Sequence, residues 1–237
     1  MTAERHADQE DGQPDAVASP PCAMHEVDAD FAGLSSERSG ENLTRWRYSE
    51  RKRLIAARMA LTVAEREAHA KRVARELDTI IPRKDGTIVS LYWPFRGEPD
   101  LRPWMTRAAA AGLRTALPIV LAKGQPLVFR EWWPGARMER GVWNIPYPAD
   151  GAFVTPAVVV APLVGFDAHG YRLGYGGGYF DRTLAGLNPR PIAIGVGHPV
   201  TAIASIFPQA YDIPMDWIVT GNGAPARGAK KAAINAS

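Results

Sequence analysis

Apolar residues in the middle of the chain fall into two patterns, short strand-like runs and longer segments with helical spacing. The run Ala157–Ala161 contains three consecutive valines and does not alternate, which is typical of a central strand covered on both faces. Thr62 and Glu65 form a capping box that predicts the start of a helix. The predicted strands are 87–93, 115–120, 126–132, 157–161, 192–196 and 217–220. The predicted helices are 45–58, 62–77, 101–111 and 178–187.

The order of these elements predicts the fold class. Strands alternate with helices, which favours an α/β domain built on one sheet. Ligands of such sheets gather at the carboxyl ends of the strands, so we expect the functional site there.

The two ends of the chain differ from the middle in composition. Residues 1–42 combine Pro, Gly, Ser, Asp and Glu with almost no aliphatic periodicity, and such a segment cannot bury enough surface to offset its ordering entropy. We expect a disordered acidic leader over 1–42. Residues 221–237 are small and basic and predict a flexible tail, which leaves 43–220 as the folded domain.

The net charge of +3 hides an asymmetry between the leader and the rest of the chain. Residues 1–42 hold 10 acidic and 2 basic residues, a net of −8, whereas the remainder holds 26 basic and 15 acidic residues, a net of +11. A basic domain can attract nucleic acid, and it suits a nucleotide or a polyglutamylated cofactor equally well. Scattered solubilising arginines also explain it. Because no RRM or KH motif is present, we expect no nucleic-acid partner.

Cysteine usage and hydropathy narrow the class of protein. Cys22 is the only cysteine, which excludes a disulfide framework and a thiolate metal cluster and suits a reducing compartment. The chain has no run of about 18 apolar residues and no export signal, so we expect a cytoplasmic protein without a membrane partner.

A glycine-rich segment between a buried strand and a helix is the strongest candidate for chemistry. Gly174, Gly176, Gly177 and Gly178 allow close backbone approach, and the following helix start offers N–H groups to an anion. The spacing is neither a Walker A loop nor a Rossmann fingerprint, and the glycines alone favour a phosphate site and a tight turn about equally. Two flanking residues favour phosphate: Arg172 supplies a fork of donors, and Asp181 is a candidate magnesium ligand.

One long segment carries a resemblance to a known family. Residues 160–182 read V-A-P-L-V-G-F-D-A-H-G-Y-R-L-G-Y-G-G-G-Y-F-D-R. This run closely resembles the signature of 5-formyltetrahydrofolate cyclo-ligase, also called methenyltetrahydrofolate synthetase. Supporting matches lie at 117–120, 126–132, 143–148 and 212–216. The resemblance covers 45–220 and leaves the leader and the tail without a function.

The resemblance implies a fold and an activity. The fold is expected to be α/β, with a mixed, mainly parallel sheet flanked by helices, similar to the ribose-5-phosphate isomerase and CoA-transferase group. The implied reaction is the ATP- and Mg²⁺-dependent closure of 5-formyltetrahydrofolate, in monoglutamate or polyglutamate form, to 5,10-methenyltetrahydrofolate with release of ADP and phosphate. We expect a monomeric enzyme in which positioning and charge neutralisation dominate phosphoryl transfer.

The same resemblance implies roles for individual residues. Asp181 and Asp212 match the two magnesium carboxylates, although Asp181 could instead favour the helix dipole and Asp212 could be a turn residue. Arg172 and Tyr179 are the catalytic candidates. The candidate ATP-binding residues are Arg47, Arg51, Arg172, Leu173, Gly174, Tyr175, Gly176, Gly177, Gly178, Tyr179 and Phe180. The candidate substrate-binding residues are Arg51, Trp93, Glu98, Tyr175, Gly176, Gly177, Gly178 and Tyr179.

Several of these residues keep an alternative interpretation. Arg47 and Arg51 are four residues apart and so share a helix face, which suits one anion, but a solvated basic face is the commoner use of such a run. Arg47 stands where the family usually has lysine, which changes the shape of the donor. Glu98 could accept hydrogen bonds from the aminopyrimidinone edge of a pterin or lie on the surface. Trp93 and Trp143 could border a planar ligand or belong to the core.

Two other functions compete with the cyclo-ligase. A folate- or nucleotide-binding homologue without turnover would keep the fold, but the presence of Arg172, Asp181, Glu98 and Asp212 together favours catalysis. A sugar-phosphate isomerase on the same fold would explain the glycine-rich segment but not the full signature.

Overall fold

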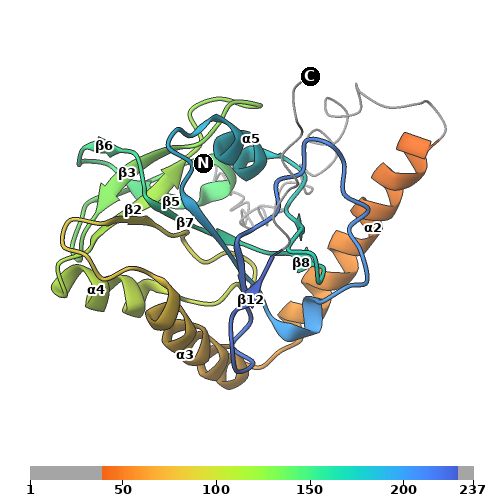
Figure 1. Cartoon of the computed structure of the whole chain (residues 1–237), viewed down its shortest axis with the longest axis horizontal. Coiled ribbons are helices and arrows are strands. Elements are labelled where there is room, and N and C mark those ends of the chain that lie inside the picture. Colours follow the sequence, from red (N-terminus) through yellow and green to blue (C-terminus); the bar gives the residue numbers. More distant parts are fainter. Residues whose placement is uncertain (1–38, 229–237) are drawn as a thin grey trace, which may run out of the picture.

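The structure is a computed structural model and describes residues 39–228 (Figure 1). Its centre is an eight-stranded sheet in the order β12-β11-β10-β7-β1-β2-β3-β6. The strands are β1 (Ile88–Ser90), β2 (Arg114–Ile119), β3 (Val128–Trp132), β6 (Phe153–Val154), β7 (Val158–Pro162), β10 (Ile192–Val196), β11 (Trp217–Val219) and β12 (Ala226–Arg227).

Strand pairing confirms the predicted fold class. The neighbours β11, β10, β7, β1 and β2 all run parallel, and the pairs β2–β3, β3–β6 and β11–β12 at the two sides are antiparallel. The register sets Val89 of β1 beside Val158 of β7. The sheet is therefore mixed and mainly parallel, and its parallel strands end at a common edge.

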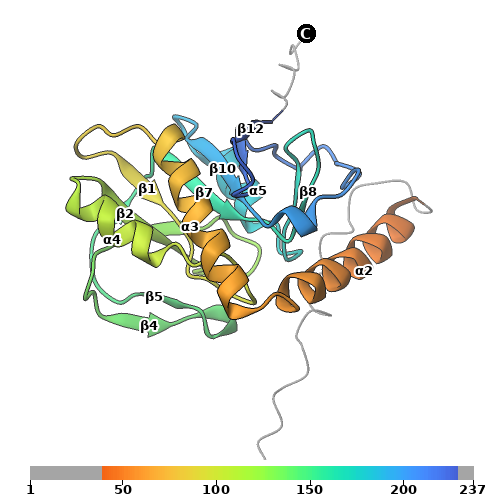
Figure 2. The same ribbon diagram turned by 90° about the horizontal axis from the view of Figure 1, so that it is seen from below.

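Helices cover both faces of the sheet, as the non-alternating run in β7 indicates. Val158 and Val160 pack with α3 (Val63–Ile80) and α4 (Arg102–Ala110), whereas Val159 and Ala161 pack on the opposite face with α5 (Tyr179–Gly186). All four β7 side chains are fully buried. Figures 1 and 2 show α3 and α4 on one side of the sheet and α5 on the other. The capping box of Thr62 and Glu65 begins α3 as predicted.

Helix α2 (Ser39–Met59) lies beside the sheet next to the short hairpin of β8 (Gly165–Phe166) and β9 (Arg172–Leu173) (Figure 2). Its Leu54 packs against Leu173 and Ile206. The helix begins six residues before the predicted start at 45, so 39–42 are helical and that part of the leader prediction is wrong. Residues 1–38 lie outside the described part of the chain.

The remaining elements are short, and the sequence did not predict them. They are β4 (Met138–Arg140), β5 (Pro146–Pro148) and the 3-10 turns η2 (Val142–Asn144) and η3 (Pro199–Thr201). The tail prediction also needs correction, because β12 pairs with β11 inside the stretch expected to be loose. Its last residues, 229–237, are outside the described range. The predicted strand at 87–93 is shorter, since β1 ends at Ser90. No helix within residues 39–228 is long and apolar enough to cross a membrane.

Candidate active site

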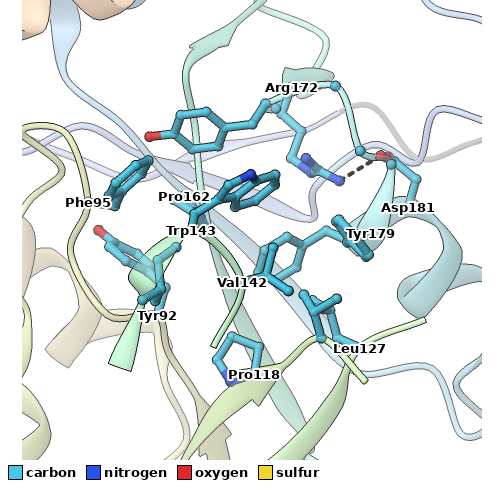
Figure 3. Close-up of a pocket in the computed structure, with 18 of the residues that line it drawn as sticks. Tyr92, Phe95, Pro118, Leu127, Val142, Trp143, Pro162, Arg172, Tyr179 and Asp181 are labelled. Carbon is cyan, nitrogen blue, oxygen red and sulfur yellow. Dashed lines mark hydrogen bonds and ion pairs between the residues drawn. The ribbon is translucent and has the colours of Figure 1, made fainter. Parts of the chain in front are cut away.

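A cavity of about 200 Å³ lies at the carboxyl ends of the central parallel strands (Figure 3). Strand β2 contributes Pro118, β7 contributes Pro162, and the segment after β1 contributes Trp93. The glycine-rich segment, α2 and the η2 turn close the other sides. The edge of the sheet predicted for ligand binding is therefore hollow, and segments far apart in the sequence meet there.

The glycine-rich segment connects strand β9 to helix α5 along one wall of this cavity. Gly176 and Gly178 have φ angles of 102° and 58°, in the left-handed region that favours glycine. A Cβ atom at Gly174 would lie 2.7 Å from Nη1 of Arg172, so a larger residue would collide with that guanidinium. The segment thus brings bare backbone to the cavity just before the N-terminus of α5, which suits an anion.

Arg172 crosses the same wall with its side chain almost fully buried. Its Nη2 atom donates a 2.7 Å hydrogen bond to Oδ2 of Asp181, which Figure 3 shows as a dashed line. Its guanidinium carbon lies 5.4 Å from the centre of the Phe180 ring. The Nε atom is buried and has no hydrogen-bond partner within residues 39–228. A buried donor without a partner is unusual, and the oxygen of a ligand or of a water molecule could accept a hydrogen bond from it.

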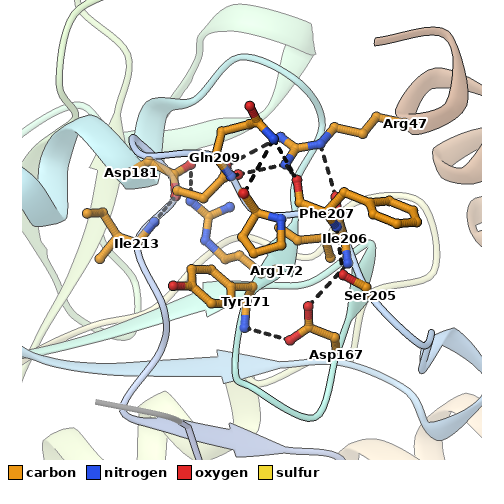
Figure 4. Close-up of polar contacts among 12 residues, drawn as sticks. Arg47, Asp167, Tyr171, Arg172, Asp181, Ser205, Ile206, Phe207, Gln209 and Ile213 are labelled. Atoms are coloured by element: carbon orange, nitrogen blue, oxygen red, sulfur yellow. Dashed lines mark hydrogen bonds and ion pairs between the residues drawn. The ribbon is translucent and has the colours of Figure 1, made fainter. Parts of the chain in front are cut away.

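Asp181 and Asp212 both line the cavity, and each carboxylate forms an ion pair with an arginine. Figure 4 shows the pair of Asp181 with Arg172. The second oxygen of Asp181 accepts from the Ile213 amide at 3.1 Å. Asp212 accepts from the Gln209 amide at 2.7 Å in addition to its arginine. Within the described residues no group of three or more His, Cys, Asp or Glu side chains gathers to hold a metal. Two carboxylates beside the glycine-rich segment still fit Mg²⁺, which protein sites bind through one or two carboxylates together with phosphate oxygens.

Arg47 and Arg51 occupy the buried face of α2 and are 8% and 7% exposed. The alternative of a solvated basic face is therefore wrong for these two residues. Arg47 donates to Asp212 at 2.6 Å and to the carbonyl oxygens of Ile206 and Phe207 at 3.2 and 2.9 Å. Arg51 donates from Nε to the Gly174 carbonyl at 2.8 Å. Arg47 is thus engaged with a carboxylate, while Arg51 braces the glycine-rich segment.

Glu98 lines the cavity beside Phe95 and is 6% exposed, so the surface alternative is wrong for it. Its Oε1 accepts a 2.8 Å hydrogen bond from the Tyr175 hydroxyl, and its Oε2 accepts from the Phe95 amide at 2.9 Å. Burial raises the pKa of Glu98 to about 7, although Arg58, the Tyr175 hydroxyl and the Phe95 amide each lower it. This carboxyl group therefore titrates near neutral pH.

Aromatic side chains also line the cavity. Trp143 points into the middle of the cavity (Figure 3), with its ring centre 6.4 Å from that of Tyr175 and 6.3 Å from that of Tyr179. It is 37% exposed and has a φ angle of 56°, so it is not a core residue. Trp93 also lines the cavity, partly packed against the core, and the Arg102 guanidinium lies 4.9 Å from its ring centre. The rings of Trp143, Tyr175 and Tyr179 offer apolar faces to a planar ligand.

Arg58 lies behind the cavity wall, in contact with Tyr175, and the sequence analysis missed its importance. It is 1% exposed and donates to the Tyr175 hydroxyl beside Glu98. The available signal was spacing, because positions 47, 51, 54 and 58 repeat every three or four residues and so share one helix face. On that face the structure buries three arginines and one leucine.

Comparison with known proteins shows the family to which the chain belongs. The sequence profile of the 5-formyltetrahydrofolate cyclo-ligase family matches residues 43–221. The chain belongs to this family. The resemblance seen in the signature segment is thereby confirmed, and the sugar-phosphate isomerase alternative is not supported.

The alignments of this chain with its cyclo-ligase relatives cover nearly the whole length of each relative. The 5-formyltetrahydrofolate cyclo-ligase of Escherichia coli strain K12 is 30% identical over 171 residues, which are 69% of this chain and 93% of the relative. The Haemophilus influenzae cyclo-ligase is 24% identical over 75% of this chain and 99% of its own. The NMR structure of Aquifex aeolicus 5,10-methenyltetrahydrofolate synthetase superposes with a TM-score of 0.66 at 26% identity, covering 80% of this chain and 96% of the other. These cyclo-ligase relatives place the chain among enzymes.

Proposed function

We propose that this protein is a working 5-formyltetrahydrofolate cyclo-ligase, which uses ATP and Mg²⁺ to close 5-formyltetrahydrofolate to 5,10-methenyltetrahydrofolate and releases ADP and phosphate. One observation carries the proposal. A single cavity holds a phosphate-type wall of glycines and arginines on one side and a carboxylate with aromatic rings on the other. Such a cavity has chemistry for two different ligands, a polyanion and a flat heterocycle.

The nucleotide would bind along the glycine-rich segment. The exposed backbone of Gly174–Gly178, the N-terminus of α5 and the Nε donor of Arg172 all suit phosphate oxygens. Arg51 supports this wall through the Gly174 carbonyl and also faces the cavity. The further residues that we assign to ATP are Arg47, Leu173, Tyr175, Tyr179 and Phe180.

Asp181 and Asp212 would hold the magnesium ion. When bound, Mg²⁺ supplies positive charge that offsets the charge developing on the phosphates. In the ligand-free protein Arg172 and Arg47 neutralise the two carboxylates. Each aspartate thus has an arginine partner that offsets its charge in a largely buried place.

The folate would bind against Glu98 and the aromatic rings. A carboxylate accepts hydrogen bonds from the amino and ring N–H groups of an aminopyrimidinone, and Glu98 is the buried carboxylate on that wall. Trp143 and Tyr179 would border the ring system, and Trp93 would form an apolar wall nearby. Arg51, Tyr175 and Gly176–Gly178 lie between the two ligands and would contact both.

The chemistry requires the formyl oxygen to face the γ-phosphate. The formyl oxygen takes the γ-phosphoryl group and ADP leaves; N10 then attacks the activated carbon, and the former formyl oxygen departs with the phosphate as N10 loses its proton. Arg172 would stabilise charge on the transferred phosphoryl group, and Tyr179 would orient the formyl group beside it. Positioning carries most of the barrier reduction, because these side chains are already fixed before the ligands bind.

A direct assay tests the proposal. Purified protein is mixed with 5-formyltetrahydrofolate, MgCl₂ and ATP, and the ultraviolet absorbance of the methenyl product is followed. Product formation that requires both ATP and Mg²⁺ supports the cyclo-ligase. Folate binding without product supports the binding-only alternative, and the absence of both overturns the proposal. A monomeric state, a cytoplasmic location and the absence of a nucleic-acid partner stay predictions.

A further inference from the structure

Arg58 is the most deeply buried arginine of α2, and the proposed reaction does not use it directly. Its exposed fraction is 1%, against 8% for Arg47 and 7% for Arg51 on the same helix face. A fully buried guanidinium is costly unless every donor finds a partner. Its partners therefore indicate why this position is a charged residue instead of a leucine.

The guanidinium of Arg58 joins three segments that are distant in sequence. Nε donates to the Arg96 carbonyl at 2.9 Å, in the loop after β1. Nη1 donates to the Leu163 carbonyl at 3.0 Å, just after β7. Nη2 donates to the Tyr175 hydroxyl at 2.8 Å, in the glycine-rich segment. All three nitrogens are engaged, so the fork is held in one orientation.

Two hydrogen bonds, each donated in the same direction, connect Arg58 to Glu98 through the Tyr175 hydroxyl. Arginine has donors and no acceptor, so the Tyr175 oxygen must accept from Arg58. The hydroxyl proton of Tyr175 is then directed to Oε1 of Glu98, 2.8 Å away. The Arg58 Nη2 atom itself lies 4.0 Å from that oxygen and adds its charge without a direct hydrogen bond.

We propose that Arg58 is a positioning residue for the folate subsite, which acts through the Tyr175 hydroxyl to hold the Glu98 carboxylate as a charged acceptor at the cavity wall. The inference rests on the proposed function, because it assigns the pterin to Glu98. It also gives α2 two tasks. Arg47 and Arg51 serve the phosphate wall, and Arg58, two to three turns further along the same face, serves the folate wall.

The charges around Glu98 explain why such support matters. Burial raises the pKa of Glu98 to about 7 even though Arg58, the Tyr175 hydroxyl and the Phe95 amide favour the ionised form. Tyr92 is the other titratable group close by, and burial together with the Glu98 charge raises its pKa, so it stays neutral. Loss of either Arg58 or the Tyr175 hydroxyl would raise the pKa of Glu98 further and leave it protonated at neutral pH.

Two variants separate this role from a purely structural one. Tyr175→Phe removes only the hydroxyl and keeps the ring, so it tests the connection even if a change at buried Arg58 prevents folding. Arg58→Lys keeps the charge but cannot reach three partners at once. The matched controls are Tyr171→Phe, which changes a tyrosine packed with the Leu54 cluster, and Arg53→Lys on the exposed face of α2.

The measurement is equilibrium binding of 5-formyltetrahydrofolate without ATP, followed by tryptophan fluorescence between pH 6 and pH 9, with ATP affinity measured separately. In the unchanged protein, folate affinity should fall as the pH drops below about 7, where Glu98 takes up a proton. Tyr175→Phe should weaken folate binding at pH 7 roughly tenfold, as expected for one lost charge-assisted hydrogen bond. The pH below which folate affinity falls should also rise by about one unit. Folded Arg58→Lys should change in the same direction, with ATP affinity unchanged because Arg58 is not assigned to the nucleotide. Both controls should keep the folate affinity and the pH dependence of the unchanged protein.

The results distinguish the inference from the proposed function. If the unchanged protein neither binds nor converts 5-formyltetrahydrofolate, the proposed function fails and the inference fails with it. If the unchanged protein binds folate and Tyr175→Phe binds it with the same affinity and the same pH dependence, only the inference is overturned. A loss of affinity in Tyr175→Phe that is equal at every pH also overturns it, because a merely structural role would have that effect.

Discussion

The Nη2 atom of Arg47 lies 2.6 Å from Oδ2 of Asp212, and both side chains are about one-tenth exposed. The sequence assigned these residues to different ligands, Arg47 to ATP and Asp212 to magnesium. In the structure they neutralise each other, and Arg172 and Asp181 form a second pair of the same kind. A nucleotide or a metal ion bound as proposed would compete with these two ion pairs. Within each pair the charges of the arginine and the aspartate offset one another.

Removal of Arg47 should show how much free energy of unfolding is lost when Asp212 has no arginine partner. Arg47→Ala should lower the free energy of unfolding by about 3–5 kcal/mol, because Asp212 becomes a buried charge without its partner. Adding Asp212→Asn to that variant should recover part of the loss. Urea denaturation measures both effects. Arg53→Ala breaks an exposed pair with Glu50 and should change the free energy of unfolding much less, because solvent screens that pair. A loss in Arg47→Ala no larger than in this control would show that the Arg47–Asp212 pair does not stabilise the fold.

Asp181→Asn should affect magnesium use more than stability. Asparagine keeps the size of the side chain, but it loses the charge that favours a cation, and its single oxygen can accept from Arg172 or from the Ile213 backbone amide and not from both. We expect the Mg²⁺ concentration needed for half-maximal turnover to rise about 10- to 100-fold, with a loss of stability no larger than that of one buried hydrogen bond, about 1–3 kcal/mol. Asp150→Asn, on an exposed carboxylate that pairs with Arg137, is the control. Unchanged magnesium dependence in Asp181→Asn would remove this residue from the metal site.

The raised pKa of Glu98 should appear in the pH dependence of stability. The ordinary value for this group is 4.5 and the folded value is about 7, so the folded state binds the proton more tightly than the unfolded chain. The stabilisation from that proton is full below pH 4.5 and is lost as the pH rises to about 7. Relative to Glu98→Gln, which does not titrate, the unchanged protein should therefore lose about 3 kcal/mol over this interval and then level off. Denaturation of both proteins at several pH values measures the difference, and a constant difference would contradict the shift.

Trp143 should contribute to folate binding. Its own backbone conformation should be strained. Trp143→Ala should weaken binding of 5-formyltetrahydrofolate roughly 2- to 10-fold, the effect of about 0.5–1.5 kcal/mol of aromatic contact. Trp133→Ala removes another exposed tryptophan and should leave folate affinity unchanged. The φ angle of 56° at Trp143 also predicts that Trp143→Gly is more stable than Trp143→Ala by about 1 kcal/mol. Equal folate affinity in Trp143→Ala and the unchanged protein would exclude a contact with the ligand.

Local patterns predicted most of the fold. The capping box of Thr62 and Glu65, the valine run of β7 and the strand at 192–196 depend on neighbours in sequence, and each formed where it was expected. The short pairs β4–β5 and β8–β9 and the edge strand β12 were missed. A strand of two or three residues carries too few positions for a period to show. The start of α2 was missed for a related reason, because its buried face is mostly arginine and lacks an apolar stripe.

The sequence by itself determined the glycine-rich segment, its helix and the family, since a contiguous signature is local information. Only the tertiary structure decided what each charged side chain contacts. Arg47 pairs with Asp212 across 165 positions, and Tyr175 reaches Glu98 across 77. The type and the sequence spacing of an arginine or a carboxylate are the same whether its side chain contacts a ligand, solvent or another buried charge. The choice depends on which partners the folded chain brings within about 3 Å. Here that choice paired both aspartates with arginines and joined Arg58 to Glu98 through one hydroxyl group.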